Sequence, residues 1–250
     1  MRDLPIAITL FAILSTCDLP FAEAASRLPE HESITYNVKW LGVTVGTITA
    51  SINGVKKIRD RDAYELEITA KTNDLVSSVY PINDRYVSYM DVEKLYTLRH
   101  EVYRREGRYK KDAVTDFDHA SGEARFRNLL DKSEKTIPIP AGVQDPVSMA
   151  YFFRTKPVKL CERMQFAVYN NESVYLLCGV AEAKIPVRIP GIGIREVLRI
   201  QPYAMLQGDM VRKGKATIYI SCDDKQIPLK GFVRAPLFTE ITAYYAEEAK

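Results

Sequence analysis

The stretch Ile34-Thr35-Tyr36-Asn37-Val38-Lys39-Trp40 alternates apolar and polar side chains without a break. Successive side chains of a strand point to opposite faces of a sheet, so this period of two predicts a strand with one face on a core and the other in water. Residues 48–53 and 64–71 repeat the alternation, with Asn53-Gly54 as turn residues between them. Glu106-Gly107 predicts a tight hairpin between strands at 99–105 and 108–116. The pattern is typical of an antiparallel sheet.

The rest of the chain continues in the same rhythm, with Gly, Pro, Asn or Asp in the connections. Further strands are expected at 76–90, 124–127, 164–169, 173–180, 184–189, 196–201, 215–221, 226–233 and 238–245. No internal repeat or low-complexity linker interrupts them.

One segment, residues 145–154, predicts a helix instead. Asp145 is a helix-capping residue type, Pro146 suits the first helical position, and apolar side chains run almost all the way round. A short helix of this kind is expected to be buried against the sheet. The predicted fold is therefore all-β and mainly antiparallel, a single barrel-like or strongly curved sheet with one short helix, over residues 26–250. Two β-rich lobes, 26–135 and 140–250, are the alternative.

The first 25 residues predict a secretory signal peptide. Arg2 precedes an apolar run at 4–17, and Ala22-Glu23-Ala24 follows as a small-residue cleavage site. The run is shorter than the roughly 20 residues that span a bilayer. We expect a periplasmic or otherwise exported product that is not an integral membrane protein after cleavage. A lipoprotein anchored through Cys17 is the alternative.

Composition and charge narrow the function classes. The 250 residues are 46% hydrophobic and 27% charged, as in folded globular proteins, which excludes a disordered chain. The net charge is +3, and it rises to about +5 when the side chains of residues 1–25 are removed. This charge favours a lipid headgroup or an anionic envelope polymer as partner, and it is too small for a nucleic-acid-binding protein.

Three cysteines remain after the predicted cleavage: Cys161, Cys178 and Cys222. Cys161 and Cys178 flank the predicted hairpin at 164–180, so a disulfide between them is left open. Their spacing is a residue or two away from direct opposition. No cysteine or histidine spacing resembles a metal site, and no metal or cofactor is expected.

Motifs for catalysis are missing from the sequence, which has no nucleophile elbow, zinc-protease, phosphate-loop or kinase signature. Two carboxylate pairs, Asp116 with Asp118 and Asp223 with Asp224, have two interpretations. Each could serve acid–base chemistry or bind calcium, or each could hold a turn through its own backbone. We favour the turn, and no catalytic residue is predicted.

Candidate ligand-binding residues are basic and aromatic. Arg104, Arg105 and Arg108 would project from the predicted hairpin tip, either as a grip on an anionic polymer, lipid or partner protein or as an ordinary solvated hairpin. Aromatic side chains on apolar faces, such as Trp40 and Tyr80, could line a ligand cavity or belong to the core.

Five separated stretches resemble, in order, those of a family of exported bacterial proteins known only as a domain of unknown function. They are Trp40-Leu41-Gly42 with Val45-Gly46, then 79–84 (VYPIND), then Asp116-Phe117-Asp118, then 145–154, which matches D-x-x-S-x-x-Y-x-x-R, and finally 218–224 (IYISCDD) with Ile227-Pro228. The resemblance covers residues 33–245 and departs at Tyr219 and Cys222. It implies an all-β barrel-like protein of the Gram-negative periplasm or a membrane face, and no catalytic residue can be carried over.

The helix pattern gives its residues specific expected roles. Asp145 caps the helix and Ser148 helps to satisfy the first turn. Tyr151 and Arg154, three residues apart, are neighbours on one helix face. A buried Arg154 needs an acceptor, for which we expect Asp224 or Asp118.

The favoured function is non-enzymatic binding of a lipid, polysaccharide or other envelope component. Its candidate binding residues are Trp40, Tyr80, Tyr151, Arg154, Arg104, Arg105 and Arg108. The alternatives are a scaffold or assembly protein with an envelope protein partner, and an envelope hydrolase that uses Asp223 and Asp224.

Overall fold

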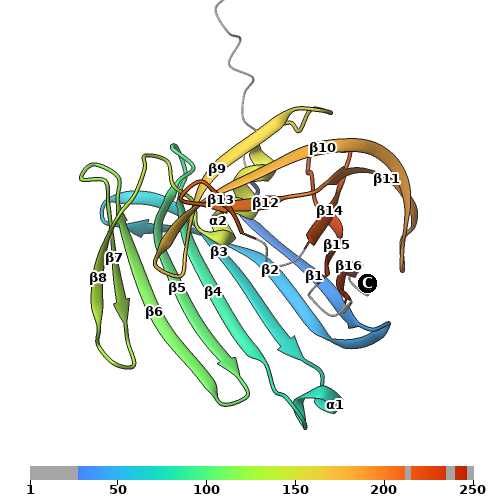
Figure 1. The fold of residues 1–250 in the computed structure, drawn as a ribbon, viewed down its shortest axis with the longest axis horizontal. Coiled ribbons are helices and arrows are strands. Elements are labelled where there is room, and N and C mark those ends of the chain that lie inside the picture. The colour runs from blue at the N-terminus through green and yellow to red at the C-terminus, as the bar shows by residue number, and fades with distance from the viewer. Residues whose placement is uncertain (1–27, 212–214, 235–239, 247–250) are drawn as a thin grey trace, which may run out of the picture.

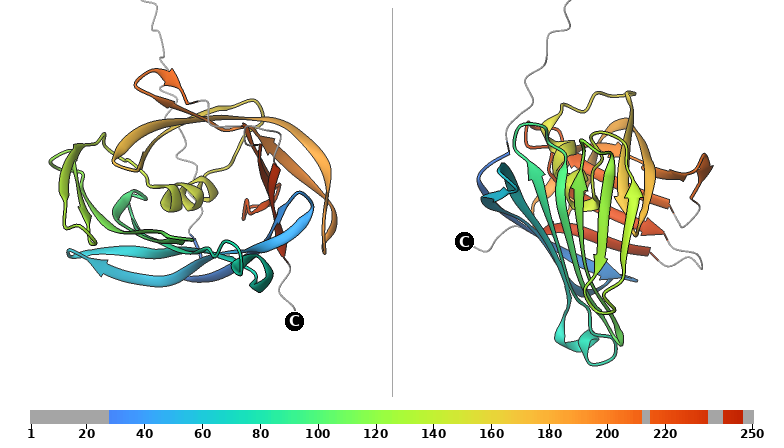
Figure 2. Two further views of the ribbon diagram at one scale, coloured as in Figure 1. Left: turned by 60° about the horizontal axis from the view of Figure 1, so that its bottom comes forward. Right: turned by 90° about the vertical axis from the view of Figure 1, so that its left-hand side faces the viewer.

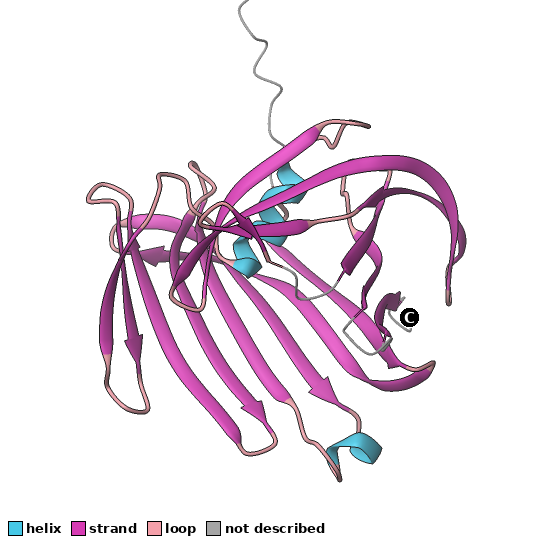
Figure 3. Ribbon diagram, in the orientation of Figure 1, coloured by secondary structure: helices cyan, strands magenta, loops and turns pink. Residues whose placement is uncertain are grey.

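The computed structural model describes residues 28–211, 215–234 and 240–246, whose strands form one curled antiparallel sheet (Figure 1). The first eight strands are β1 (His31–Trp40), β2 (Val43–Ile58), β3 (Arg61–Thr72), β4 (Asn83–Asp91), β5 (Thr97–Glu106), β6 (Tyr109–Asp118), β7 (Glu123–Asn128) and β8 (Glu134–Pro138). The others are β9 (Arg163–Asn170), β10 (Ser173–Ile189), β11 (Gly193–Ile200), β12 (Tyr203–Leu206), β13 (Asp209–Met210), β14 (Lys215–Ser221), β15 (Pro228–Arg234) and β16 (Glu240–Ala246). The helical segments are α1 (Asp74–Ser77), α2 (Pro146–Phe152) and the 3-10 turn η1 (Phe153–Thr155) (Figure 3).

Strand order explains how the two halves of the chain form one sheet. The order is β13-β12-β10-β11-β14-β15-β16-β1-β2-β3-β4-β5-β6-β7-β8, and β9 also pairs with β10. β1 lies between β16 and β2, so the first and last described strands are neighbours in the middle of the sheet. The sheet curls around α2 without closing (Figure 2). The predicted all-β, strongly curved fold with one short buried helix is confirmed.

Alternation places a row of apolar side chains from β1, β2 and β3 on the concave face. In register, Tyr36 lies opposite Ile48, and Ile48 lies opposite Ala70. Two residues along, Ile34 lies opposite Ala50 in the same way. These rows form the wall that α2 and the cavities described below face, so the period of two in the sequence determines which side chains line the interior.

Helix α2 forms because its first turn is fully capped. The Asp145 carboxylate accepts hydrogen bonds from the backbone N–H groups of Val147 and Ser148, and the Ser148 hydroxyl accepts one from the Asp145 N–H. This capping box confirms the predicted roles of both residues. Val147 and Tyr151 then pack with Leu66 and other apolar side chains of β2–β4. The helix fills one end of the curled sheet and leaves the other end open.

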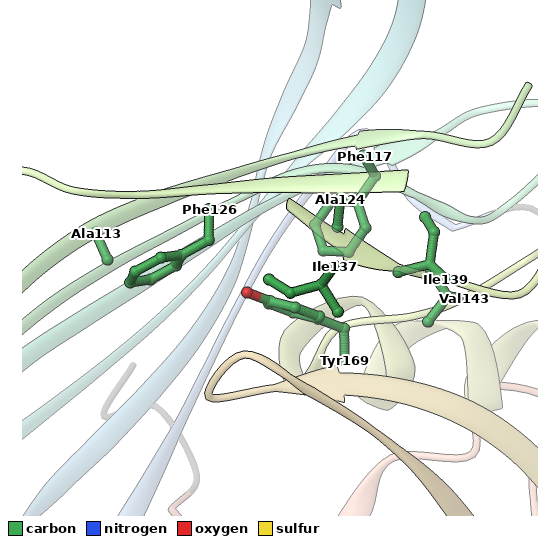
Figure 4. Close-up of a cluster of buried hydrophobic side chains, with 8 residues drawn as sticks. All are labelled: Ala113, Phe117, Ala124, Phe126, Ile137, Ile139, Val143 and Tyr169. Atoms are coloured by element: carbon green, nitrogen blue, oxygen red, sulfur yellow. The ribbon is translucent and has the colours of Figure 1, made fainter. Parts of the chain in front are cut away.

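A second apolar cluster joins the β8 edge to β9 (Figure 4). The Tyr169 ring meets the Phe117 ring edge-on, with 5.2 Å between centroids. The backbone of Gln144 bonds Ala167 and Tyr169 of β9, at 3.0 and 2.7 Å. These contacts hold the chain that leads into α2 between the β8 edge and β9.

Three predictions differ from the structure, and three short strands were not predicted. The strand predicted at 76–90 is wrong at its start: residues 74–77 form α1, capped by Asn73, and β4 begins only at Asn83. β2 continues through Asn53-Gly54 with a bulge, and the turn lies at Arg59 and Asp60, both with positive φ. The runs 173–180 and 184–189 are one strand, β10. The short strands β8, β12 and β13 were not predicted.

Cys161, Cys178 and Cys222 are free thiols, so the disulfide left open between Cys161 and Cys178 is not formed. The Cys161 N–H donates to the Ala181 carbonyl, whereas Cys178 lies opposite Gln165 in the β9–β10 ladder. Cys161 therefore lies beside Ala181 of β10, three residues along the strand from Cys178. The predicted signal peptide and Cys17 lie outside the described residues. Within the described ranges, no helix is long and apolar enough to cross a membrane.

Candidate ligand-binding interior

A large cavity lies at the open end of the concave face. We call it the mouth cavity, with a volume of about 540 Å³. It lies between β1, β2, β3 and the segment around α1, and its lining is almost wholly apolar. Characteristic lining residues are Trp40, Ile48, Ala70, Val76, Tyr80 and Ile241. The structure thus brings Trp40 and Tyr80, two predicted binding residues, to one cavity.

Two further cavities continue along the same face towards α2. The central chamber, about 250 Å³, shares Ile48 with the mouth cavity and is also lined by Tyr36, Tyr151 and Arg154. The third cavity, about 240 Å³, shares Ala150, Ile218 and Pro228 with the central chamber. Because neighbouring cavities share walls, the concave face offers a continuous apolar lining from its open end to the far side of α2.

Arg154 supplies the charge in the wall of the central chamber, and it is only 6% exposed. Its Nη1 and Nη2 donate to the two carboxylate oxygens of Glu32 at 2.5 and 2.8 Å, and its Nε donates to the Lys225 carbonyl at 3.1 Å. The expected partners, Asp224 or Asp118, are wrong, because β1 brings Glu32 to the arginine from 122 residues away. The guanidinium charge is therefore balanced inside the wall.

Two phenol groups complete the polar part of the chamber. Burial raises the pKa of Tyr36 and of Tyr151 above the usual range, so both are neutral donors at physiological pH. The Tyr151 side chain is 2% exposed, and its hydroxyl has no hydrogen-bond partner among the described residues. The predicted pair Tyr151 and Arg154 does meet, with the guanidinium carbon 5.4 Å from the ring centroid.

A buried hydrogen-bond network lies at the start of α2. The sequence analysis did not predict it. The fully buried Asp145 carboxylate accepts from the Ser88 hydroxyl at 2.5 Å and the Thr97 hydroxyl at 2.9 Å, besides the N–H groups of Val147 and Ser148. The hydroxyls come from β4 and β5. One carboxylate thus ties two strands to the helix.

The network contains the residue types of a hydrolase triad, Ser88, His100 and Asp145. Their hydrogen bonds differ from those of a triad. The Ser88 hydroxyl donates to Asp145 itself, and His100 Nδ1 lies 3.2 Å from the Val87 carbonyl and 3.4 Å from Asp145. All three side chains are buried, and none lines the three cavities. A nucleophile needs a base and room for substrate, so this network is structural.

The hairpin arginines do not form one basic patch. Arg104 pairs with Glu106 and lies 3.7 Å from Asp84, whereas Arg105 donates two hydrogen bonds to Asp112, at 2.6 and 2.9 Å. Arg108 is exposed in the turn between β5 and β6. Two of the three predicted charges are therefore already compensated by carboxylates.

The carboxylate pairs lie in turns or ion pairs. Asp118 accepts from the N–H groups of Ala120 and Ser121, as predicted for a turn. Asp223 and Asp224 are both exposed in the β14–β15 turn, where Asp223 accepts from the Ser221 hydroxyl at 2.6 Å. This pair lacks the cleft that the hydrolase interpretation requires. In the described ranges, no group of three or more His, Cys, Asp or Glu side chains is placed to hold a metal ion.

Asp116 sits among three arginines instead of pairing with Asp118. Its carboxylate lies 2.8 Å from Arg99, 3.0 Å from Arg127 and 3.2 Å from Arg59. Burial alone raises the pKa of this carboxyl, but the Arg99 hydrogen bond and the charges of the three arginines outweigh burial and lower it. The ionised form is therefore favoured by folding.

Asp116 is expected to contribute an acid-sensitive part of the stability. Because its folded pKa is lowered, the stabilisation is fully present above the unfolded pKa of about 4 and is lost as the pH falls through the folded value. Urea unfolding over a pH series should show wild type more stable than Asp116→Asn at neutral pH, with the difference vanishing in acid. A difference that stays constant down to the acid limit would contradict this assignment.

Comparisons with known proteins agree with this architecture. A crystal structure described as a beta-barrel-like protein of the domain of unknown function DUF1849 from Brucella abortus aligns with a TM-score of 0.58 at 9% identity, covering 89% of this chain and 98% of that one. At that identity the likeness shows the fold alone. No curated protein matches the sequence. A family model described as protein of unknown function (DUF3108) matches residues 35–234. Since that match spans most of the sequence and fits the expected resemblance to an uncharacterised family, the chain belongs to the DUF3108 family.

Proposed function

We propose that this protein binds the hydrocarbon chain of a lipid or similar amphiphile along its concave face, without chemical conversion. The observation that carries the proposal is the continuous apolar lining of the mouth cavity, the central chamber and the third cavity. The mouth cavity alone, at about 540 Å³, has the size of a small-molecule site. Water makes few hydrogen bonds with such walls, so a hydrocarbon chain is the occupant that their chemistry favours.

The energetics are adequate for binding. Each methylene transferred from water to an apolar site contributes roughly 0.8 kcal/mol. A chain of about ten methylenes would contribute roughly 8 kcal/mol before the costs of association. This gain needs no charged contact, which suits a chamber whose lining arginine, Arg154, is already paired with Glu32.

Exposed apolar side chains surround the entrance to the mouth cavity and support a role with lipids. Those that lie in or directly beside the β1–β2 turn, or on and after α1, are Trp40, Leu41, Val43, Leu75, Val79 and Tyr80. Asn73 holds the two segments together, because its N–H donates to the Val45 carbonyl and its side-chain amide to the Thr44 carbonyl. A cluster of exposed apolar residues marks an interaction site on a folded protein.

We also propose that the protein is exported to the cell envelope. The leader-like sequence at residues 1–25 supports export, and the resulting mildly basic chain suits a compartment rich in anionic lipids and polymers. An amphiphile-binding protein of the periplasm would then hold its ligand away from water between membrane faces.

A matched pair of substitutions on β3 tests the binding proposal. Ala70 lines the mouth cavity and its neighbour Thr69 points to the other face of the sheet, so Ala70→Phe should fill the cavity and Thr69→Phe should not. The readouts are native mass spectrometry of each purified protein, organic extraction of any bound molecule, and titration with a single-chain lipid.

Wild type and Thr69→Phe are expected to bind one chain, and Ala70→Phe is expected to lose at least tenfold in affinity. Equal binding by Ala70→Phe and wild type would contradict the mouth cavity as the site. Failure of wild type to bind any single-chain lipid would contradict the proposed function.

A further inference from the structure

Tyr151 carries a buried polar group in the wall of the central chamber. The residue is 2% exposed and lines the chamber, and its hydroxyl has no partner among the described residues. A buried hydroxyl without a partner costs about 1–3 kcal/mol, so such groups are rare unless something else supplies the hydrogen bond. The other polar side chain of α2, Ser148, is satisfied, because its hydroxyl is bonded to Thr97 and to the Asp145 backbone.

The electrostatic surroundings restrict what that partner can be. Arg154 and Glu32, both of which influence the Tyr151 hydroxyl, form a two-contact ion pair with no net charge. A carboxylate or phosphate placed beside them would bring an uncompensated negative charge into an apolar chamber and close to the Glu32 carboxylate. Burying such a charge is costly. An uncharged oxygen can accept the Tyr151 hydrogen bond without that cost.

We propose that the central chamber recognises an uncharged oxygen of the bound amphiphile, such as an ester or amide carbonyl or a hydroxyl, through a hydrogen bond donated by Tyr151. This inference rests on the proposed function, because the hydrocarbon part of the same molecule would occupy the neighbouring cavities. It makes the ligand class a neutral single-chain alcohol, ester or amide and disfavours a free fatty acid. Tyr36 of β1 also lines this chamber.

Three probes of equal chain length separate the contributions of the hydrocarbon chain, an uncharged oxygen and a negative charge to affinity: tetradecane, 1-tetradecanol and tetradecanoate. Each is delivered from cyclodextrin at neutral pH, where the acid is ionised. Trp40 lines the mouth cavity and is the only tryptophan of the sequence, so its fluorescence follows occupancy. The variant is Tyr151→Phe. The control is Tyr169→Phe, which removes a buried hydroxyl that already contacts Thr115 in a different apolar cluster.

The expected result is that wild type binds the alcohol at least tenfold more tightly than tetradecanoate. Tyr151→Phe should weaken the alcohol about fivefold, the effect of one hydrogen bond, and leave tetradecane unchanged. Ligand-free Tyr151→Phe should be at least as heat-stable as wild type, because the substitution removes an unpaired buried hydroxyl. Affinity for the alcohol thus falls without a loss of stability, which a purely structural role would not produce. Tyr169→Phe should leave all three affinities unchanged.

Other outcomes distinguish a failure of the proposed role of Tyr151 from a failure of hydrocarbon-chain binding. If Tyr151→Phe does not weaken the alcohol, if it weakens the alcohol and the alkane alike, or if tetradecanoate binds most tightly, the proposed role of Tyr151 is wrong while chain binding stands. If wild type binds none of the three probes, the proposed function fails together with this inference.

Discussion

An Asp145→Ala variant is expected to lose about 4 kcal/mol of its free energy of unfolding, measured by urea denaturation. The substitution removes the acceptor for the hydroxyls of Ser88 and Thr97 and for the N–H groups of Val147 and Ser148, all inside the core. Each buried donor left unsatisfied costs about 1–3 kcal/mol before the structure relaxes. The loss includes the helix cap, which alone contributes about 0.5–2 kcal/mol.

Asp131 provides the control for that prediction. It is an exposed turn aspartate whose carboxylate accepts from the N–H and hydroxyl of Ser133. Asp131→Ala should change the free energy of unfolding by less than about 0.5 kcal/mol. Asp145→Asn, which keeps one oxygen acceptor, should fall between the two alanine variants. If Asp145→Ala were no more destabilising than Asp131→Ala, the buried network would not hold α2 in the sheet.

An Arg154→Met variant is expected to lose about 3–5 kcal/mol, because it leaves the Glu32 carboxylate without its partner in a mostly buried position. The Lys225 carbonyl also loses a donor. A Glu32→Met/Arg154→Met double variant should regain part of that loss, since an ion pair replaced as a whole by apolar side chains leaves no unpaired charge. Urea unfolding of the four members of this cycle gives the coupling between the two residues.

Arg105 and Asp112 form the matched pair at the surface. Their contact has the same two-bond geometry, but the Arg105 side chain is 40% exposed, compared with 7% for Arg154. Arg105→Met should therefore cost about 1 kcal/mol or less. Equal losses in Arg154→Met and Arg105→Met would contradict the claim that Arg154 anchors the wall of the central chamber.

Local rules predicted what depends on neighbours in the sequence. The alternation at Ile34–Trp40 identified β1 and its apolar face, and the Asp145, Pro146 and Ser148 pattern identified α2 with its cap. Both features follow from period and capping chemistry within ten residues. The strand error at 76–90 has the same origin, because Asn73 accepts the N–H of Val76 and starts a helical turn in a stretch that otherwise has strand-like residues.

The ion pair, the buried network and the cavities depend on contacts between distant parts of the chain, which sequence spacing does not specify. Arg154 meets Glu32, not Asp118 or Asp224, because β1 lies beside β16 and reaches the far end of α2. The network around Asp145 combines residues of β4, β5 and α2. A serine or threonine in an alternating strand does not indicate that its hydroxyl will bond a distant carboxylate. The cavities arise from the curl of the whole sheet. The sequence could therefore name Trp40, Tyr80, Tyr151 and Arg154 as candidates, but only the fold shows which of them line the same cavity.

Binding of a hydrocarbon chain along the concave face is tested most directly by quenching of Trp40 with a chain that carries bromine. A brominated tetradecanol in the mouth cavity would lie against Trp40, the only tryptophan of the sequence. We predict saturable quenching with one chain per protein in wild type and Thr69→Phe, and a strongly reduced effect in Ala70→Phe. Fluorescence that does not change up to the solubility limit of the chain, or quenching that is equal in all three proteins, would contradict the account.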